Sequence, residues 1–178
     1  MGRMDTGEWL TRGTVWLALS LFVASQIVKA ARRACESVAA ARWLNSFGCA
    51  AFLVHVASAF QFYHAWSHSA AYADTARQTA ELFGWNWGGG IYFNYLFALL
   101  WIGDVAWAWA KPTGYRTRPR WTIRVVRTFV WFMMLNGAVV FARGAVRGYG
   151  LILCLALVLC WWPTRKRISR PPDQSQPA

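Results

Sequence analysis

Four long apolar stretches follow one another along the chain, separated by short polar segments. They cover residues 14–31, 43–66, 91–110 and 123–142, and each approaches or exceeds the length of about 20 apolar residues that a helix needs to cross a bilayer. A fifth stretch, residues 148–162, is shorter, and its length also fits a re-entrant or tilted interfacial segment. The pattern predicts an all-α fold, a polytopic transmembrane helical bundle with five spans, four long and one short.

The segment between the second and third stretches has a different pattern. Apolar positions recur at helical spacing from Tyr72 to Phe83, and charged or amide side chains occupy the opposite face. This predicts an amphipathic helix over residues 69–83 that lies along the outer membrane surface and ends at Gly84. Trp87 follows and suits the headgroup level, because an indole ring is apolar with one polar N–H.

Three consecutive glycines at 88–90 lead into the third stretch. They form either a flexible turn or a backbone segment that approaches a ligand closely, beside Asn94. They are not a phosphate-binding loop, because the preceding strand and the Lys-Ser/Thr pair of that motif are missing.

The composition agrees with a membrane protein. The chain of 178 residues is 57% hydrophobic and 15% charged, whereas a soluble domain is about half apolar and about a quarter charged. The formal net charge of +12 comes from short basic clusters between apolar stretches. No folded polar domain is left to form a groove-binding surface, so nucleic acid is excluded as a partner.

The basic clusters also predict an orientation, because Lys and Arg are retained on the cytoplasmic side. They lie within residues 29–42, 111–124 and 165–170, and they share one side only if the chain crosses five times. The N-terminus is then outside and the C-terminus cytoplasmic. Arginine outnumbers lysine 16 to 3, which is typical of a GC-rich bacterial genome, so the predicted location is the bacterial inner membrane.

Two parts of the chain are expected. Residues 1–162 form a single transmembrane domain, and its first span is interpreted as an uncleaved anchor, since cleavage would leave a basic cluster outside. Residues 163–178 have too little apolar content to fold and predict a disordered basic cytoplasmic tail that contacts anionic lipids.

His64 and His68 lie four residues apart near the outer end of the second predicted span. On one continuous helix their rings are about 40° apart around the axis, so both can reach one metal ion. A stable site needs three or four protein ligands, which Asp74, Glu81 or water would complete. The alternatives are two imidazoles bonded to water and loop backbone, or a pair that handles protons.

His55 and Asp104 are ionisable residues inside predicted spans. Counted from the outer helix ends at about 1.5 Å per residue, they and Asn136 lie at similar depths. An ionisable side chain in hydrocarbon needs a partner or a wet cavity and is a functional candidate by default. We expect His55 and Asp104 to meet, as a catalytic pair or as a buried structural pair. A bond from Asp104 to Trp101 or Trp107 is the other option.

Arg143 and Arg147 lie one helical turn apart in the last outer turn, against the charge rule. They either bind an anionic headgroup or substrate, or pair with Asp74 and Glu81 of the surface helix.

Two functional hypotheses follow. The first is an outward-opening polar site, walled by the second, third and fourth spans, that binds a metal, a cofactor such as a quinone, or a small polar or lipid ligand. The cofactor is unknown; a divalent metal is one candidate, and haem is disfavoured because all three histidines lie on one span. The second is a non-catalytic accessory or assembly subunit of a larger membrane complex. Whether the protein is an enzyme is left open.

Overall fold

The computed structural model describes residues 6–31, 35–142 and 145–161, and within these ranges the chain is helical with no strand. The helices are α1 (Thr6–Ala31), α2 (Cys35–Tyr63), α3 (His68–Phe83), α4 (Gly90–Ala110), α5 (Pro112–Arg116), α6 (Arg120–Leu135), the π-helical turn η1 (Asn136–Val140) and α7 (Ala145–Trp161). The predicted all-α bundle is confirmed.

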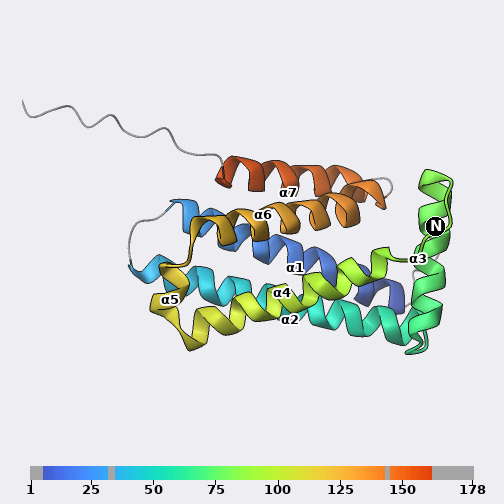
Figure 1. The fold of residues 1–178 in the computed structure, drawn as a ribbon, viewed down its shortest axis with the longest axis horizontal. Coiled ribbons are helices and arrows are strands. Elements are labelled where there is room, and N and C mark those ends of the chain that lie inside the picture. Colours follow the sequence, from blue (N-terminus) through green and yellow to red (C-terminus); the bar gives the residue numbers. More distant parts are fainter. Residues whose placement is uncertain (1–5, 32–34, 143–144, 162–178) are drawn as a thin grey trace, which may run out of the picture.

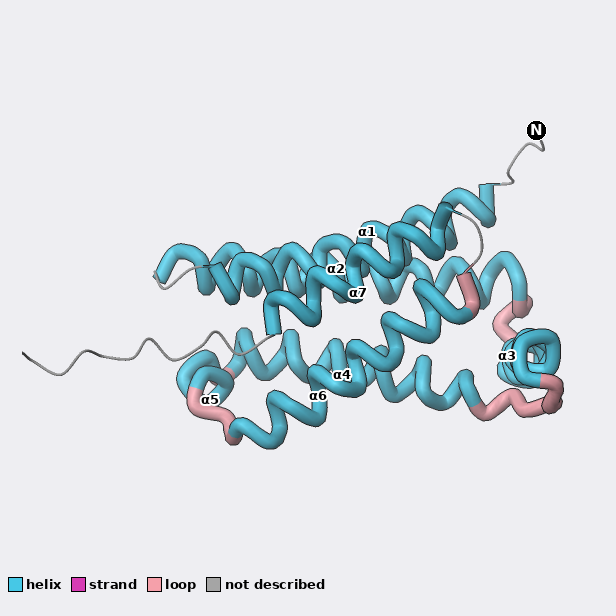
Figure 2. Tube along the Cα trace, turned by 90° about the horizontal axis from the view of Figure 1, so that it is seen from above, coloured by secondary structure: helices cyan, strands magenta, loops and turns pink. Residues whose placement is uncertain are grey.

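The bundle consists of α1, α2, α4, α6 and α7, which lie side by side along a common axis (Figure 1). Contacts join neighbours in the cyclic order α1, α2, α4, α6 with η1, α7 and back to α1. In Figure 2, α1, α2 and α7 form one layer and α4 and α6 the other. Helix α3 lies across one end of the bundle, and the short helix α5 lies at the other.

Within the described part of the chain, four helices are long and apolar enough to cross a membrane. They are Thr6–Ala30, Val38–Tyr63, Gly90–Ala110 and Arg120–Val140. The fifth predicted stretch is also helical, but α7 has 17 residues and is shorter than these four.

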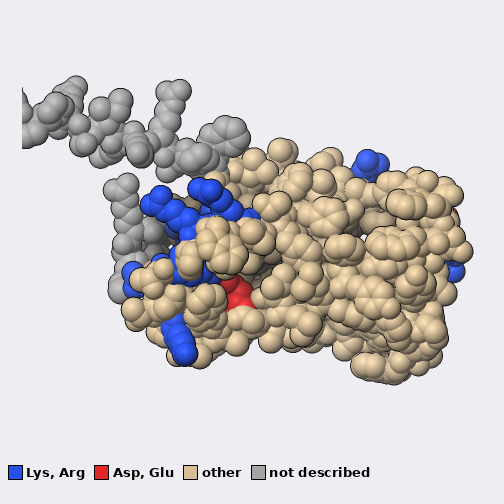
Figure 3. Space-filling model, viewed as in Figure 1, with Lys and Arg blue, Asp and Glu red and all other residues tan. Residues whose placement is uncertain are grey.

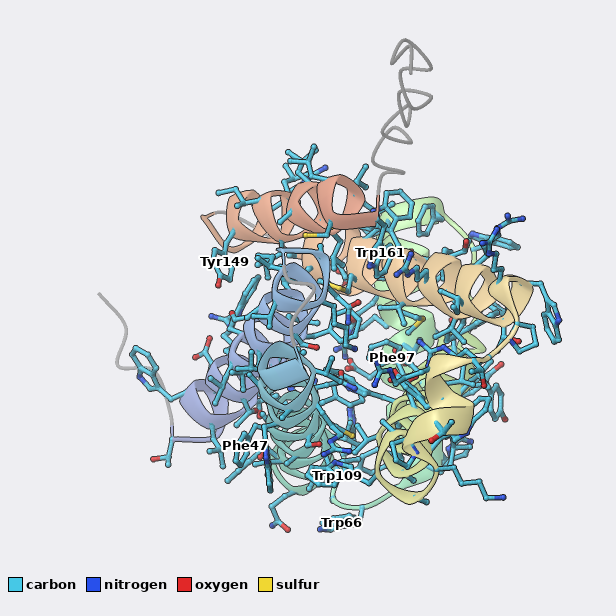
Figure 4. The ribbon with its side chains drawn as sticks, turned by 90° about the vertical axis from the view of Figure 1, so that its left-hand side faces the viewer. Phe47, Trp66, Phe97, Trp109, Tyr149 and Trp161 are labelled. Carbon is cyan, nitrogen blue, oxygen red and sulfur yellow. The ribbon has the colours of Figure 1, made fainter. Side chains whose placement is uncertain are left out.

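Aromatic side chains fill the centre of the ring of helices. Phe97, near the middle of the bundle in Figure 4, packs edge-on against Phe52 and beside Trp101. Met134 and Leu157 are fully buried beside them. Because these side chains come from α2, α4, α6 and α7, the core ties together helices that are distant in sequence.

The turn between α2 and α3 sets the direction of the surface helix. Ala65 and Trp66 adopt φ values of 45° and 57°, which end the α2 helix after Tyr63. The Ser67 hydroxyl then accepts from the Ala70 N–H and caps α3. At its other end, Gly84 has φ 79° and donates its N–H to the Ala80 carbonyl. The predicted amphipathic helix and its end at Gly84 are therefore confirmed.

The two ends of the bundle differ in charge. Helix α1 begins beside the end of α2, where Gly7 contacts Phe62, at the end that α3 covers. The last turn of α1, helix α5 and the end of α7 lie at the opposite end. Figure 3 shows most of the visible Lys and Arg side chains gathered there. We call this the basic end and the other the α3 end.

Candidate functional site

A cavity of about 530 Å³ lies between the bundle and α3. Its walls come from α1, α2, α4, α6 and η1, and its cover comes from α3 and the segment 84–89. This volume is within the range of about 300–1,000 Å³ that small-molecule sites occupy. We call it the α3 cavity.

Aromatic side chains from several segments line the α3 cavity. They include Trp16, Phe60, Trp85, Trp87 and Tyr95. Trp85 and Trp87 stack with their ring centres 6.3 Å apart, so the segment before the glycines presents flat apolar surfaces to this space. Such a lining favours a ring or an acyl chain over a small hydrophilic ion.

A few polar side chains interrupt this lining. They are His55 of α2, His64 just after α2, Thr75, Gln78 and Thr79 of α3, Asn94 of α4 and Asn136 of η1. Thr75 and Thr79 donate their hydroxyls to carbonyls of their own helix. The hydrogen-bonding capacity of the cavity therefore rests mainly on the two imidazoles and the three amides.

His55 is fixed by a backbone contact. Its Nδ1 lies 2.8 Å from the Thr11 carbonyl oxygen, so Nδ1–H is the donor. In the neutral ring Nε2 then carries a lone pair and accepts hydrogen bonds. The ring also packs against Phe52, which lines the same cavity. His55 thus offers an acceptor whose orientation the α1–α2 contact sets.

Asn136 stands where α6 changes into the π-helical turn. Its Nδ2 donates to the Phe132 carbonyl oxygen at 2.8 Å, which leaves its second N–H and its Oδ1 for other partners. Its backbone carbonyl accepts from the Phe141 N–H, closing the wider turn. Single π-helical turns occur often at functional sites, because the extra residue redirects side chains.

The structure contradicts the pairing of His64 with His68 on one helix. His64 follows the last residue of α2, and His68 is the first residue of α3. The left-handed residues between them turn the chain across the bundle, so the one-turn spacing does not apply. His68 instead bonds through Nδ1 to the Tyr95 hydroxyl at 2.9 Å. Across residues 6–31, 35–142 and 145–161, no group of three His, Cys, Asp or Glu side chains is suited to hold a metal ion.

The structure also places Asp104 away from His55. Helix α2 ends at Tyr63, so His55 lies about 12 Å below that end, whereas Asp104 lies about 21 Å from Gly90 at the start of α4. The expected common depth was wrong for Asp104, because its partner Asn45 lies ten residues before His55 on α2, about 15 Å away along the helix axis. His55 and Asn136 do line one cavity. His55 lines the α3 cavity, and Asp104 lines a separate cavity at the basic end.

Asp104 has its own set of partners. Its Oδ2 accepts from Asn45 Nδ2 at 3.2 Å and from the Tyr115 hydroxyl at 2.9 Å. Its Oδ1 pairs with Arg118 at 3.0 Å. Burial, together with the Asp104 carboxylate, raises the pKa of Tyr115 to about 12. The Trp101 indole donates to Asn45 rather than to Asp104.

The glycine run allows close packing against α3. A Cβ at Gly88 would overlap the Tyr72 carbonyl, and one at Gly89 would overlap the Trp87 ring. Gly88–Gly90 do not have positive φ values. Of the two interpretations, the structure shows close approach, but to the protein's own surface helix.

The two outer arginines are only partly described. Arg143 lies outside the described residues. Arg147 is exposed on α7. Asp74 forms its ion pair with Arg77 of its own helix and accepts from Gln78, so within the described ranges it does not pair with Arg147.

The α3 cavity therefore gathers five of the nine residues singled out from the sequence. These are His55, His64, Trp87, Asn94 and Asn136. Sequence reasoning missed Gln78 as a lining residue, and it missed Asn45 and Tyr115 as partners of Asp104. The polar stripe of the surface helix contained Gln78, but no local pattern marked the other two. Comparisons with protein-family models, curated proteins and solved structures found no match for this chain.

Proposed function

We propose that this chain is a small integral membrane protein whose α3 cavity binds a largely apolar ligand with a hydrogen-bonding head, of the quinone or lipid class. The single observation that carries the proposal is an aromatic-lined cavity of about 530 Å³ into which two imidazoles and three amides are gathered. In this proposal the bundle spans a bacterial inner membrane with the α3 end outside.

Outward-facing side chains of the bundle support the membrane part of the proposal. Large apolar residues are exposed on the long helices and on α7, among them Leu99, Trp121, Ile152, Leu155 and Leu159. Contiguous exposed apolar surface is unfavourable in water and favourable against lipid chains. The concentration of Lys and Arg at one end fits the cytoplasmic side.

The lining supports the chemistry of the ligand. A quinone ring or a lipid ester is flat or apolar over most of its surface and carries carbonyl oxygens, which accept hydrogen bonds. The second N–H of Asn136, the Asn94 amide and a His64 ring nitrogen are candidate donors, while His55 Nε2 accepts from a hydroxyl of a reduced ring. Trp87 contributes an aromatic face.

Binding and extraction test the proposal together. Detergent-purified protein is extracted with organic solvent, and the extract is analysed by mass spectrometry for quinones and lipids. A short-chain benzoquinone and its reduced form, the hydroquinone, are then titrated separately while tryptophan fluorescence is followed, because Trp16, Trp85 and Trp87 line the cavity. We expect one bound molecule per chain and saturable quenching.

Neighbouring residues on α2 provide a matched pair of variants. His55→Leu removes the acceptor in the cavity and is expected to weaken binding of the reduced ring, the hydroquinone, about tenfold, the loss of roughly one well-placed hydrogen bond. Val54→Leu alters a side chain that is 47% exposed and does not line the cavity, and should leave binding unchanged. Ligand-free extracts with no saturable quenching would overturn the proposal. Loss of accumulation in both variants would point to the accessory-subunit alternative.

A further inference from the structure

Basic side chains converge on two small cavities at the basic end. The first, of about 100 Å³, is lined by Lys29, Arg118 and Arg127 together with Asp104. The second, of about 130 Å³, lies beside it and is lined by Lys29, Arg42 and Arg116. Because Lys29 lines both, the two cavities are parts of one region between α1, α2, α4, α5 and α6.

Among the described side chains that line the two cavities, five are Lys or Arg and one, Asp104, is a carboxylate. Asp104 is already engaged by Arg118 at 3.0 Å and by Asn45 and Tyr115. Lys29 interacts electrostatically with that same Asp104 and also with Arg118 and Arg127, which repel it. The region therefore keeps a positive excess after its internal ion pair is counted.

Two of the remaining arginines contact aromatic rings rather than carboxylates. Arg42 lies over the Trp109 ring at 4.0 Å, and Arg127 lies over the Trp161 ring at 5.4 Å. Arg42 donates one N–H to the Ala108 carbonyl at 3.4 Å, but its Nε is buried without a hydrogen-bond partner. A buried donor without a partner costs free energy unless an acceptor joins it. Lys29, Arg116 and Arg127 are exposed, so their charges are open to an anion that approaches from outside the bundle.

We infer that the basic end binds a phosphate group, held by Lys29, Arg127 and Arg42. Guanidinium groups match phosphate oxygens with paired N–H donors, and a lysine adds a point charge. Basic pockets between helices on the cytoplasmic side of a membrane take anionic lipid headgroups in this way. The phosphate is either a phospholipid headgroup or a soluble phosphate, and both meet the same donors. This site is independent of the α3 cavity, at the opposite end of the bundle.

The neighbouring arginines of α6 allow a matched test. Arg127 lines the first cavity, whereas Arg124, about one turn away on the same exposed helix, lines neither. Arg127→Gln and Arg124→Gln change the net charge equally. Lys29→Gln provides a second variant in the site on a different helix, so that a folding defect in one variant does not decide the outcome.

The experiment uses the full-length protein in a zwitterionic detergent. Phosphatidylglycerol is added in one arm and inorganic phosphate in the other. Bound lipid is counted by native mass spectrometry, and bound phosphate is measured by calorimetry. We expect saturable binding of one phosphate-bearing molecule, weakened at least tenfold by Arg127→Gln and by Lys29→Gln and changed less than twofold by Arg124→Gln.

The two arms distinguish the sources of the phosphate. Saturable phosphatidylglycerol binding that inorganic phosphate does not compete away assigns a lipid headgroup; calorimetric phosphate binding that lipid does not displace assigns a soluble ligand. The inference is overturned if neither probe binds, or if Arg124→Gln weakens binding as much as Arg127→Gln, which would show only general surface charge. Quinone binding in the α3 cavity is measured in the same preparations, so that the two proposed sites are tested independently of each other.

Discussion

The two ends of the bundle differ in what the fold leaves open: empty volume at the α3 end, and positive charge at the basic end. At the α3 end, folding leaves a cavity of about 530 Å³ with few polar groups. At the basic end the cavities are about 100 and 130 Å³, but charge is in excess. Empty volume in an apolar setting is stabilised by a ligand of matching shape, and excess charge is stabilised by a counter-ion. The two proposed sites therefore differ in kind: shape would select the ligand at one end and charge would select it at the other.

The polar groups at the two ends also differ in how they are held. Asp104 has three side-chain partners from α2, α5 and the segment after α5. His55 is held by one hydrogen bond, to a backbone carbonyl, and by packing against Phe52. Side chains in a shared network depend on one another, so substitutions at the basic end should be coupled, whereas those around the α3 cavity should be more independent.

Asp104→Asn is expected to have the largest effect on stability. The amide keeps the shape of the side chain but leaves Arg118 without its counter-charge. Both side chains of this pair are about a fifth exposed (19% and 22%), so the loss should be near the lower end for a buried pair, about 3 kcal/mol in the free energy of unfolding.

Urea titration in detergent micelles, followed by tryptophan fluorescence, measures the effect of Asp104→Asn. The double variant with Arg118→Gln should recover part of the loss, because it removes the unpaired charge. Quinone binding at the α3 end should be unchanged. A loss below about 1 kcal/mol would show that the ion pair is replaced by solvent.

Gly150→Ala tests how closely the cavity wall is packed. A Cβ at Gly150 would overlap the carbonyl of Ala138, which lines the α3 cavity. Helix α7 must then move away from η1, at a cost of about 2 kcal/mol for overpacking. Gly148→Ala is the control, because a Cβ there meets open space and alanine favours the helix by about 1 kcal/mol. Equal stability of the two variants in the same titration would contradict the close contact.

Tyr115→Phe probes the neutral part of the basic-end network. Removal of one hydrogen bond to Asp104 should cost about 1 kcal/mol. The pKa of Tyr115 is about 12 in the folded protein and about 10 in an unfolded chain. Between these values the folded state binds more protons, so the stability of the protein falls as pH rises from about 10 to about 12.

Denaturant titrations at several alkaline pH values separate the Tyr115 contribution. The part of the decline due to Tyr115 should be missing in Tyr115→Phe, and the absorbance step of its phenolate near pH 12 should disappear. An unchanged pH dependence in the variant would assign the decline to other groups.

His68→Phe is expected to have the smallest effect. His68 bonds to the Tyr95 hydroxyl and so ties α3 to α4, but this contact is exposed, and its net worth is about 0.5 kcal/mol. Tyr95→Phe removes the same bond, and the double variant should lose no more than either single one. Additive losses, measured by the same urea titration, would show that the two side chains act separately.

Much of the fold was predictable because it depends on local properties. The runs of apolar residues gave the positions of the long helices, and the change to an amphipathic pattern gave α3 with its end at Gly84. The spacing of the basic clusters predicted that three of them share one side. The described parts of the first two, within 29–42 and 111–124, lie at one end of the bundle, and the third, 165–170, lies outside the described residues. Part of the lining of the α3 cavity was also predictable, because His55, Asn94 and Asn136 are polar residues in otherwise apolar helices.

The side-chain contacts between helices were not predictable in the same way. The stretches that form α2 and α4 are apolar on nearly all sides, so their pattern does not specify how each helix is rotated about its axis. That rotation directs Asp104 toward Asn45 and Tyr115, and it directs His55 toward Thr11. The left-handed turn at Ala65 and Trp66, which separates His64 from His68, involves no glycine or proline that would mark it.

The sequence by itself determined that the chain forms long apolar helices, a surface helix and a charged end, because hydropathy and capping act over a few neighbouring residues. Only the tertiary structure decided which side chains meet. Rotation, helix ends and close contacts such as that of Gly150 with Ala138 follow from the packing of all five bundle helices together, and no single segment contains that information.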